Sequence, residues 1–284
     1  MTTSKHAAHA RRARYTRPAT SSPDRRGFTM TEVLIVVGLL TLLASLFLPV
    51  VSKVRSAANG AVCLSNLRQM GTAWTMETAE NRGRLMPYVW QTPKSPDEAW
   101  NGYWPGALER REVRGEALLC PMADEALDAA ANKGLGNAAH AWTGRFSSNG
   151  TAIRMNATTY RQGSYGYNRY LTAQGGFGKN GKGDNLTAVK ANMATTPVFL
   201  DAAWVDVRPT NGGEGLPVQP PPNLTGEGLK PGSPEHWKFL LARHGRSVNV
   251  YFADGSARRV DLADTYTLTW TADWVGYKLD LPSR

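Results

Sequence analysis

Several patterns that mark catalytic or metal sites are missing from this sequence. It has only two cysteines, Cys63 and Cys120, and it contains no CxxC pair, no HExxH pattern, no complete phosphate-binding loop and no GxSxG nucleophile elbow. His236 and His244 lie eight residues apart, and no carboxylate pattern accompanies them. We therefore expect a protein that is not an enzyme and that holds no cofactor.

Acidic residues are nearly absent from the start of the chain. Residues 1–27 contain seven of the 33 lysines and arginines but a single carboxylate, Asp24, which leaves residues 28–284 with a net charge of only +4. The overall charge of +10 is thus mainly a property of the N-terminal tail. A short basic tail is typical of a topology or targeting signal, so we expect no nucleic-acid binding.

Charge is absent altogether from residues 33–52, VLIVVGLLTLLASLFLPVVS. A helix of this length spans ~30 Å, the thickness of the hydrocarbon core of a bilayer. The run is too long for the apolar region of an ordinary secretory signal, which has about 7 to 15 residues. Only Lys53 and Arg55 follow it closely, so the charge distribution places the N-terminus in the cytoplasm and the remainder outside.

One carboxylate, Glu32, stands directly before the apolar run. At the level of the lipid headgroups, the free-energy cost of this charge would be small. Deeper in the membrane the cost is larger, and a carboxylate there usually has a partner. The segment RRGFTMTEVL resembles the prepilin signature of type IV pilins and of the pseudopilins of type II secretion. In that family a prepilin peptidase cuts after the glycine, and the new N-terminal residue is then N-methylated. The resemblance implies a cut between Gly27 and Phe28, methylation of Phe28, and pairing of Glu32 with the Phe28 amine of a neighbouring subunit.

Helical periodicity continues past the apolar run. Cys63, Leu67, Met70 and Trp74 recur at steps of four, three and four, which is one face of a helix. This stripe predicts a helix that continues to about Glu80 and packs against the globular part. Within the apolar run, Pro49 lies where many pilin helices bend. An interior proline removes a backbone hydrogen bond and kinks a helix, so we expect a bend at this position.

Strand, helix and loop patterns follow in the rest of the chain. Residues 164–172 and 197–207 are rich in aromatic and β-branched side chains and predict strands, and residues 124–134 predict a short helix. Between the predicted strands, QGGFGKNGKGDN is glycine-rich and must be a loop. Asp184 in this loop could bind calcium, but the spacing matches no calcium-loop pattern, so a plain loop is favoured.

A hairpin is predicted near the C-terminus. Val248, Val250 and Phe252 alternate with polar residues, and Asp254-Gly255 supplies a tight turn before a partner strand, so that the hairpin element spans residues 244–262. On one extended strand His244 and Asp254 would lie ~33 Å apart, which disfavours a catalytic or metal-binding pair. We interpret Asp254 as a turn residue, and His244 as a residue that fixes the start of the strand through a hydrogen bond.

The same segment carries a second resemblance. His244, nine further residues and Asp254-Gly255 resemble the H-X9-DG element near the C-terminus of a large group of bacterial prepilin-like proteins. In that group, segments similar to CLSNLRQMG, LCP and SYGYN occur in this order, and here they are residues 63–71, 119–121 and 164–168.

The two cysteines lie outside the cytoplasm in this topology, where disulfides persist. If Cys63 and Cys120 pair, closure of the loop would stabilise the fold by roughly 4 kcal/mol in the chain-entropy model and would tie the helix to the globular part. Two buried free thiols are the alternative.

These observations, with the resemblance, imply an α+β, pilin-like protein with a long N-terminal helix packed on a mainly antiparallel β-sheet. The expected parts are a basic cytoplasmic leader (1–27), a transmembrane helix (28–52), a helical stem (53–82) and an extracytoplasmic α+β domain (83–284). The expected location is the inner membrane, crossed once, with a periplasmic C-terminal domain.

The function that the resemblance implies is structural: a pseudopilin, or pilin-like subunit, of a type II secretion or type IV pilus-like filament. Its partners would be the prepilin peptidase and methyltransferase, other pilin-like subunits and the inner membrane. The alternative is a membrane-anchored binding or adhesion protein that uses the prepilin pathway without forming a filament. Polysaccharide binding through exposed tryptophans would favour this alternative.

Overall fold

The computed structural model describes residues 27–86, 100–123, 134–143, 146–148, 151–153, 162–173, 176, 186–211 and 217–283. The chain divides into two compact units between Val50 and Val51, and each is described by itself. Asp184 and most of the helix predicted at 124–134 lie outside the described residues.

Helix α1 (Met30–Glu80) runs without interruption through both units and through position 49, where the sequence predicts a bend. By length and composition it is the one helix in the described residues that could cross a membrane, a criterion that signal sequences also meet. None of the side chains in its most apolar window is buried by the rest of the chain.

The C-terminal end of α1 is capped by the backbone. The amide of Gly83 donates to the carbonyl of Thr78 at 2.8 Å, and the amide of Arg82 donates to that of Ala79 at 3.1 Å. This is the bonding pattern of a Schellman motif. The left-handed position that glycine usually takes is occupied by Arg82 (φ 58°), and Gly83 follows with φ 81°. The helix therefore ends where the sequence predicts.

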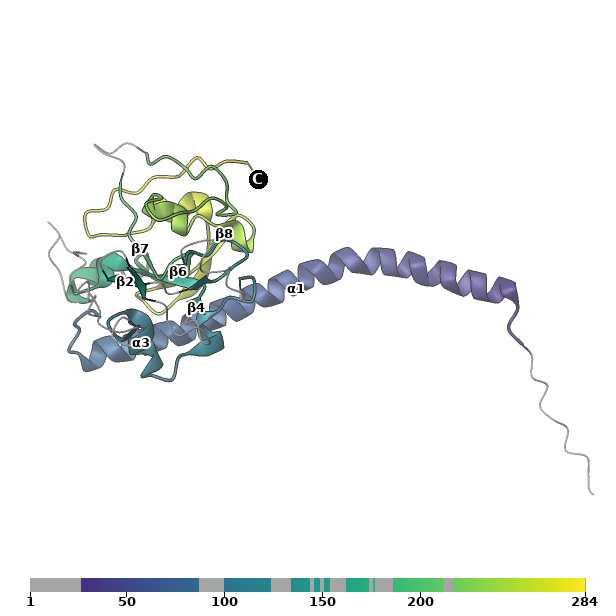
Figure 1. Cartoon of the computed structure of the whole chain (residues 1–284), viewed down its shortest axis with the longest axis horizontal. Helices are drawn as coiled ribbons and strands as arrows, with labels where there is room; N and C mark the ends of the chain where they lie inside the picture. The colour runs from purple at the N-terminus through teal and green to yellow at the C-terminus, as the bar shows by residue number, and fades with distance from the viewer. Residues whose placement is uncertain are drawn as a thin grey trace, which may run out of the picture. The chain divides into compact units, whose positions relative to one another are not determined.

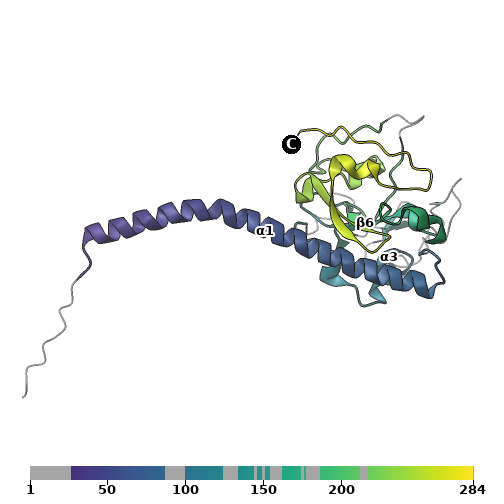
Figure 2. The same ribbon diagram turned by 180° about the vertical axis from the view of Figure 1, so that it is seen from behind.

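A five-stranded sheet forms the centre of the second unit, with strand order β7-β5-β6-β8-β9. The strands are β5 (Tyr165–Asn168), β6 (Pro197–Asp201), β7 (Asp206–Val207), β8 (Ser247–Phe252) and β9 (Ala257–Asp261). All neighbours are antiparallel except β5 and β7. The fold is thus α+β, with a long N-terminal helix and a mainly antiparallel sheet, in a pilin-like arrangement (Figures 1 and 2).

Two hydrophobic cores cover the two faces of this sheet, because side chains alternate along each strand. The first core contains the predicted stripe of α1, Cys63, Leu67, Met70 and Trp74, packed with Tyr165, Tyr167, Phe199 and Tyr251. The second core contains Leu200, Val248, Val250 and Phe252 with the aromatic side chains of Phe239, Tyr266 and Trp270. Strand β8 contributes side chains to both cores. Because the stripe of α1 belongs to the first core, the second half of α1 is fixed to one face of the sheet.

Shorter elements surround the sheet. Helix α3 (Trp104–Glu109) and the 3-10 turn η1 (Gly115–Leu118) precede two small strand pairs, β1 (Trp142–Thr143) with β4 (Gln162–Gly163) and β2 (Phe146–Ser148) with β3 (Thr151–Ile153). Further 3-10 turns are η2 (Arg169–Leu171), η4 (Leu186–Asn192), η6 (Glu235–Lys238), η7 (Ala242–His244) and η8 (Leu262–Thr267). Arg111, just after α3, forms ion pairs with Glu77 and Glu80 at the end of α1.

The two strands predicted at 164–172 and 197–207 are shorter than expected. The first ends at Asn168 and continues as η2. The second is divided into β6 and β7. The amide of Ala202 still donates to the carbonyl of Ser164, next to β5, whereas the amide of Ala203 donates to the carbonyl of Lys238 at 2.7 Å and leaves the ladder.

Candidate functional site

The predicted processing site lies at the start of α1. Gly27, Phe28 and Thr29 precede the first helical residue, and the side chain of Phe28 is 89% exposed. A peptidase needs backbone that is accessible and outside a helix, and the Gly27–Phe28 bond meets both conditions.

Glu32 forms a capping box with Thr29. The Thr29 amide and hydroxyl donate to Oε2 of Glu32 at 2.8 and 2.9 Å, and the Glu32 amide donates to the Thr29 hydroxyl at 3.2 Å. The motif T-x-x-E satisfies helix N-terminal amides that would otherwise have no partner, and a carboxylate there also interacts favourably with the helix dipole. Glu32 therefore has a local role in starting α1, which we did not predict from the sequence.

The apolar surface that follows Glu32 has no partner among the residues that the structure describes. Leucine, valine, isoleucine and phenylalanine side chains between Val33 and Val51 are 48 to 71% exposed, and no charged residue interrupts them. An apolar surface of this length is stable only in a bilayer or against other apolar surfaces.

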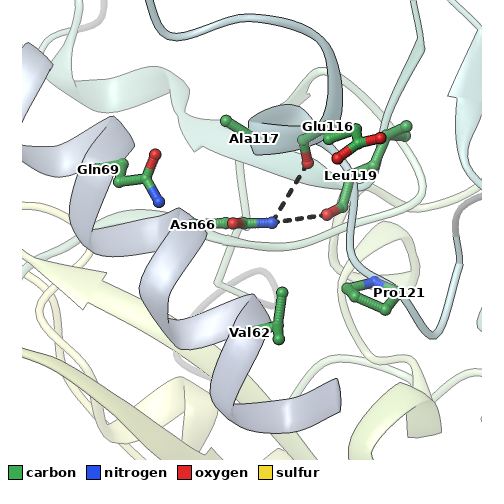
Figure 3. A pocket seen from close by; sticks show the side chains of 7 residues that line it. All are labelled: Val62, Asn66, Gln69, Glu116, Ala117, Leu119 and Pro121. Atoms are coloured by element: carbon green, nitrogen blue, oxygen red, sulfur yellow. Dashed lines mark hydrogen bonds between the residues drawn. The ribbon is translucent and has the colours of Figure 1, made fainter. Parts of the chain in front are cut away.

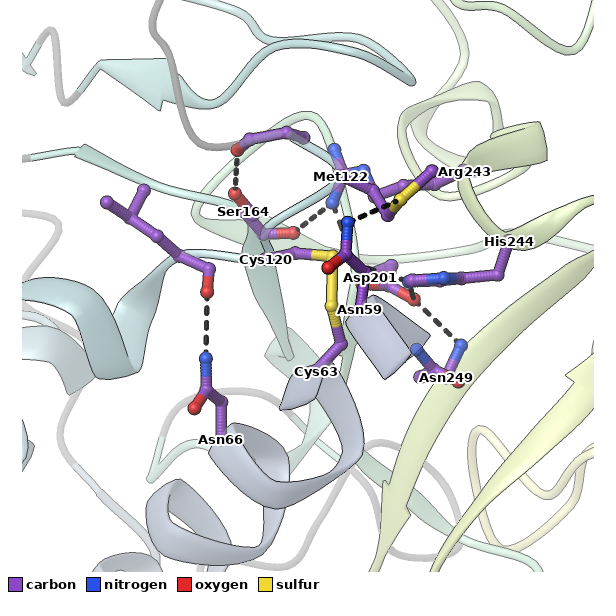
Figure 4. The surroundings of a disulfide bond; sticks show 12 residues. Asn59, Cys63, Asn66, Cys120, Met122, Ser164, Asp201, Arg243, His244 and Asn249 are labelled. Atoms are coloured by element: carbon purple, nitrogen blue, oxygen red, sulfur yellow. Dashed lines mark hydrogen bonds and ion pairs between the residues drawn. A yellow bond between two sulfur atoms is a disulfide. The ribbon is translucent and has the colours of Figure 1, made fainter. Parts of the chain in front are cut away.

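The segments of the second resemblance meet at one buried place in the second unit (Figure 4). Cys63 of α1 forms a disulfide with Cys120 of the LCP segment, with Cα atoms 5.1 Å apart. His244 of η7 lies beside it, with Nε2 3.4 Å from Sγ of Cys120. Ser164, which opens SYGYN, accepts a hydrogen bond at its carbonyl from Arg243 at 2.5 Å. We call this cluster of the disulfide, His244, Arg243 and Asp201 the disulfide hub.

Two buried charges complete the disulfide hub. Asp201, at the end of β6, places Oδ2 3.4 Å from Nε2 of His244 and Oδ1 3.7 Å from the guanidinium of Arg243. Burial lowers the pKa of the Arg243 guanidinium, and the charge of Asp201 opposes this effect. Arg243 also donates to the carbonyls of Asn137, Ala138 and Ser164. A buried ion pair of this kind is stable when its remaining hydrogen-bonding groups are satisfied.

Some polar atoms in the disulfide hub have no hydrogen-bond partner within the described part of the chain. They are Oδ1 of Asp201, Nδ1 of His244 and both side-chain atoms of Asn249. Buried polar atoms are normally satisfied, so such a group needs an explanation, for example a bound water or ion. The Asn249 backbone amide, by contrast, donates to Oδ2 of Asp201 at 2.8 Å.

A buried tyrosine connects the hub to α1. The Tyr165 hydroxyl lies 3.5 Å from the carbonyls of Cys63 and Leu119. Burial, and then the nearby Asp201 carboxylate, raise the pKa of Tyr165, so the hydroxyl stays protonated and can donate to these carbonyls.

His244 and Asp254 occupy separate environments. Oδ1 of Asp254 accepts hydrogen bonds from the Ser256 amide and hydroxyl at 2.9 and 2.7 Å, and Gly255 has φ 90°. These are the interactions of a turn residue. His244 precedes β8 in η7, and its Nε2 faces Cys120 and Asp201. Sequence patterns do not indicate Asp201, Arg243 or Asn249 as partners, since these residues lie on three different segments.

One pocket of about 460 Å³ lies between α1 and the LCP segment (Figure 3). Its lining residues are Val62, Asn66, Gln69, Glu116, Ala117, Leu119 and Pro121, and Asn66 donates to the carbonyl of Leu119 at 2.8 Å. Glu116 is its single ionisable side chain, so this pocket has no acid and base pair for catalysis.

The tryptophans serve mainly as core residues. Trp74, Trp100, Trp104, Trp142 and Trp270 are at most 3% exposed, and Trp204, Trp237 and Trp274 are partly buried. No described tryptophan is classed as exposed, and three of them are partly accessible.

Comparison with known proteins identifies the N-terminal segment. Residues 22–48 match the prokaryotic N-terminal methylation motif, which includes Gly27, Phe28 and Glu32. No curated protein and no solved structure matches the chain. The chain thus carries a prepilin-type N-terminal motif, which supports processing by a prepilin peptidase and a single-pass membrane anchor.

Proposed function

We propose that this protein is a structural subunit, a pseudopilin or pilin-like protein, of a type II secretion or type IV pilus-like filament. The observation that carries the proposal is the methylation motif at residues 22–48, joined to a long helix with an exposed apolar surface. In this proposal the helix anchors the subunit in the inner membrane and later packs against helices of other subunits. The protein has no catalytic role.

The local geometry of Glu32 is compatible with a role in assembly. Both hydrogen bonds from Thr29 reach Oε2, and Oε1 has no partner in the described residues. After cleavage, the amine of Phe28 on a neighbouring subunit could pair with Oε1 while the capping box stays in place. Such a pair would offset the cost of placing either charge in an apolar environment.

Mass spectrometry of the mature N-terminus tests the proposal. The full chain is expressed in membranes with a prepilin peptidase, extracted in detergent and analysed intact and after proteolysis. We expect a chain that begins with methylated Phe28. A chain that keeps Met1, or that is cut after the apolar run, would refute the proposal.

A membrane-anchored binding or adhesion protein without a filament remains the second candidate. It would share the processed N-terminus, so only assembly distinguishes the two functions. Most of the described tryptophans are core residues, which supports the filament subunit over a polysaccharide-binding protein.

A further inference from the structure

The disulfide hub brings together four side chains whose donor atoms are typical zinc ligands. The sulfurs of Cys63 and Cys120 and a nitrogen of His244 all lie within 4.8 Å of one another, and Oδ2 of Asp201 lies 3.4 Å from Nε2 of His244. We propose that, when Cys63 and Cys120 are reduced, these four residues form a tetrahedral zinc site that is an alternative to the disulfide. This inference is independent of the proposed filament function.

Two separations in the hub match edges of a zinc tetrahedron. With Zn–S of about 2.3 Å and Zn–N or Zn–O of about 2.0 Å, sulfur and nitrogen ligands lie ~3.5 Å apart, and nitrogen and oxygen ligands ~3.3 Å apart. The observed separations are 3.4 Å for Cys120 Sγ to His244 Nε2 and 3.4 Å for His244 Nε2 to Asp201 Oδ2. The two sulfurs must separate to ~3.8 Å, and the Asp201 oxygen, which is not among the ligand atoms that lie within 4.8 Å of one another, must move towards the sulfurs.

The charges of the hub balance when zinc is bound. Two thiolates and the Asp201 carboxylate carry three negative charges, and a zinc ion with the Arg243 guanidinium carries three positive charges. With the disulfide in place, Asp201 and Arg243 neutralise each other, at 3.7 Å. Both states are therefore neutral overall, which a fully buried site requires.

The surroundings of the hub provide one of the outer contacts that zinc ligands usually have, the contact to Asp201. The Asn249 amide donates to Oδ2 of Asp201 and orients the carboxylate. A His244 that binds zinc through Nε2 carries its proton on Nδ1, the atom that has no partner in the described residues. His244 also lines a pocket of about 420 Å³, which gives a route from solvent to the site. Lys53 and Arg259 at the rim of this pocket are exposed, so their charge is screened.

Zinc and the disulfide exclude each other, because each uses both sulfurs. Oxidation of the zinc-bound thiolates forms the S–S bond, releases the Zn²⁺ ion and transfers two electrons to a protein disulfide, whose S–S bond breaks and which takes up two protons from water to become a dithiol. The zinc-bound state would therefore precede oxidation and would hold α1 and the LCP segment together until the covalent bond forms.

Cobalt titration tests the site on the full chain in detergent. One sample is reduced with a phosphine under anaerobic conditions, and an identical sample is left oxidised. We expect the reduced protein to bind one cobalt ion with the visible spectrum of a tetrahedral, sulfur-ligated centre, and to exchange it for zinc. The oxidised protein should show no such spectrum. A reduced protein without this spectrum would overturn the proposal.

Two variants test the ligands that are not cysteines. In the reduced state, His244→Ala and Asp201→Asn should each weaken zinc binding by at least ~10-fold, the lower bound for loss of even an outer-shell partner. His236→Ala is the matched control, because His236 is also buried but bonds to the Gln219 carbonyl. If His244→Ala fails to fold, the test of the zinc site depends on Asp201→Asn, because asparagine keeps the shape of the aspartate side chain. Unchanged zinc affinity in Asp201→Asn would exclude Asp201 from the site.

Discussion

The disulfide hub combines a disulfide with a fully buried ion pair, and both join residues that are distant in the sequence. Asp201 and Arg243 have no exposed side-chain surface, and Cys63 and Cys120 are fully buried beside them. Removal of one partner from a buried ion pair leaves an uncompensated charge and typically costs about 3–5 kcal/mol. The hub therefore determines much of the stability of the second unit.

The disulfide itself should be a large contribution. Cys63 and Cys120 are 57 residues apart in sequence, and the chain-entropy model gives about 4 kcal/mol for a loop of that length. We expect the double variant Cys63→Ala/Cys120→Ala to lower the free energy of unfolding by about this amount in denaturant titrations. Wild type with and without reductant is the control. Equal unfolding midpoints for the oxidised wild type and the double variant would contradict this expectation.

His236 should make stability depend on pH. Burial lowers the pKa of His236 below its ordinary value of 6.5. The unfolded chain then binds a proton at a higher pH than the folded chain, so the His236 contribution is fully present above pH ~6.5 and is lost as the pH falls below it. We expect the unfolding free energy of wild type to fall more between pH 7.5 and pH 5 than that of His236→Gln. Identical slopes would show that His236 does not contribute.

At the scale of elements, α1 and β8 approach each other closely at one glycine. A Cβ atom at Gly71 would lie 2.0 Å from the ring of Tyr251. Close contact of this kind needs a residue without a side chain, and the same contact buries Tyr251 in the first core.

We therefore expect Gly71→Ala to destabilise the protein by about 1–3 kcal/mol, the usual cost of an overpacked core. The matched control is Gly38→Ala in the same helix, where a Cβ atom would meet nothing within 4 Å. Alanine favours helix over glycine by about 0.5–1 kcal/mol, so Gly38→Ala should cause no loss. The measurement is the thermal unfolding midpoint of the two variants in the same detergent. A Gly71→Ala variant as stable as Gly38→Ala would show that Tyr251 moves aside.

Local patterns were sufficient to predict some elements and not others. The stripe from Cys63 to Trp74, the end of α1 and the hairpin at Asp254-Gly255 depend on neighbours within a few residues, so periodicity and turn chemistry revealed them. The division of residues 197–207 depends on a bond from Ala203 to Lys238, which no local pattern encodes. The position of His244 beside Cys120 depends on three segments that meet only in the folded chain.

At the scale of the whole molecule, the chain joins a globular unit to a helix whose apolar surface has no partner of its own. Glu32 is the single carboxylate at the start of that helix. If assembly depends on its charge, Glu32→Gln should still be cleaved after Gly27 but should give few or no filaments by electron microscopy. The exposed Glu227→Gln is the control and should assemble as wild type. Normal filaments from Glu32→Gln would argue against the charge pair.

The disulfide joins α1 to the globular unit part of the way along the helix, at Cys63, seventeen residues before its end at Glu80. If the protein assembles as proposed, a subunit that is pulled out of the bilayer would carry a mechanical load along this helix. Noncovalent packing shares such a load between Leu67, Met70 and Trp74, and these contacts can slip one after another. The disulfide at Cys63, the first residue of the stripe, would receive this load before the noncovalent contacts. A force applied along α1 would then move the globular unit without separating the helix from the sheet.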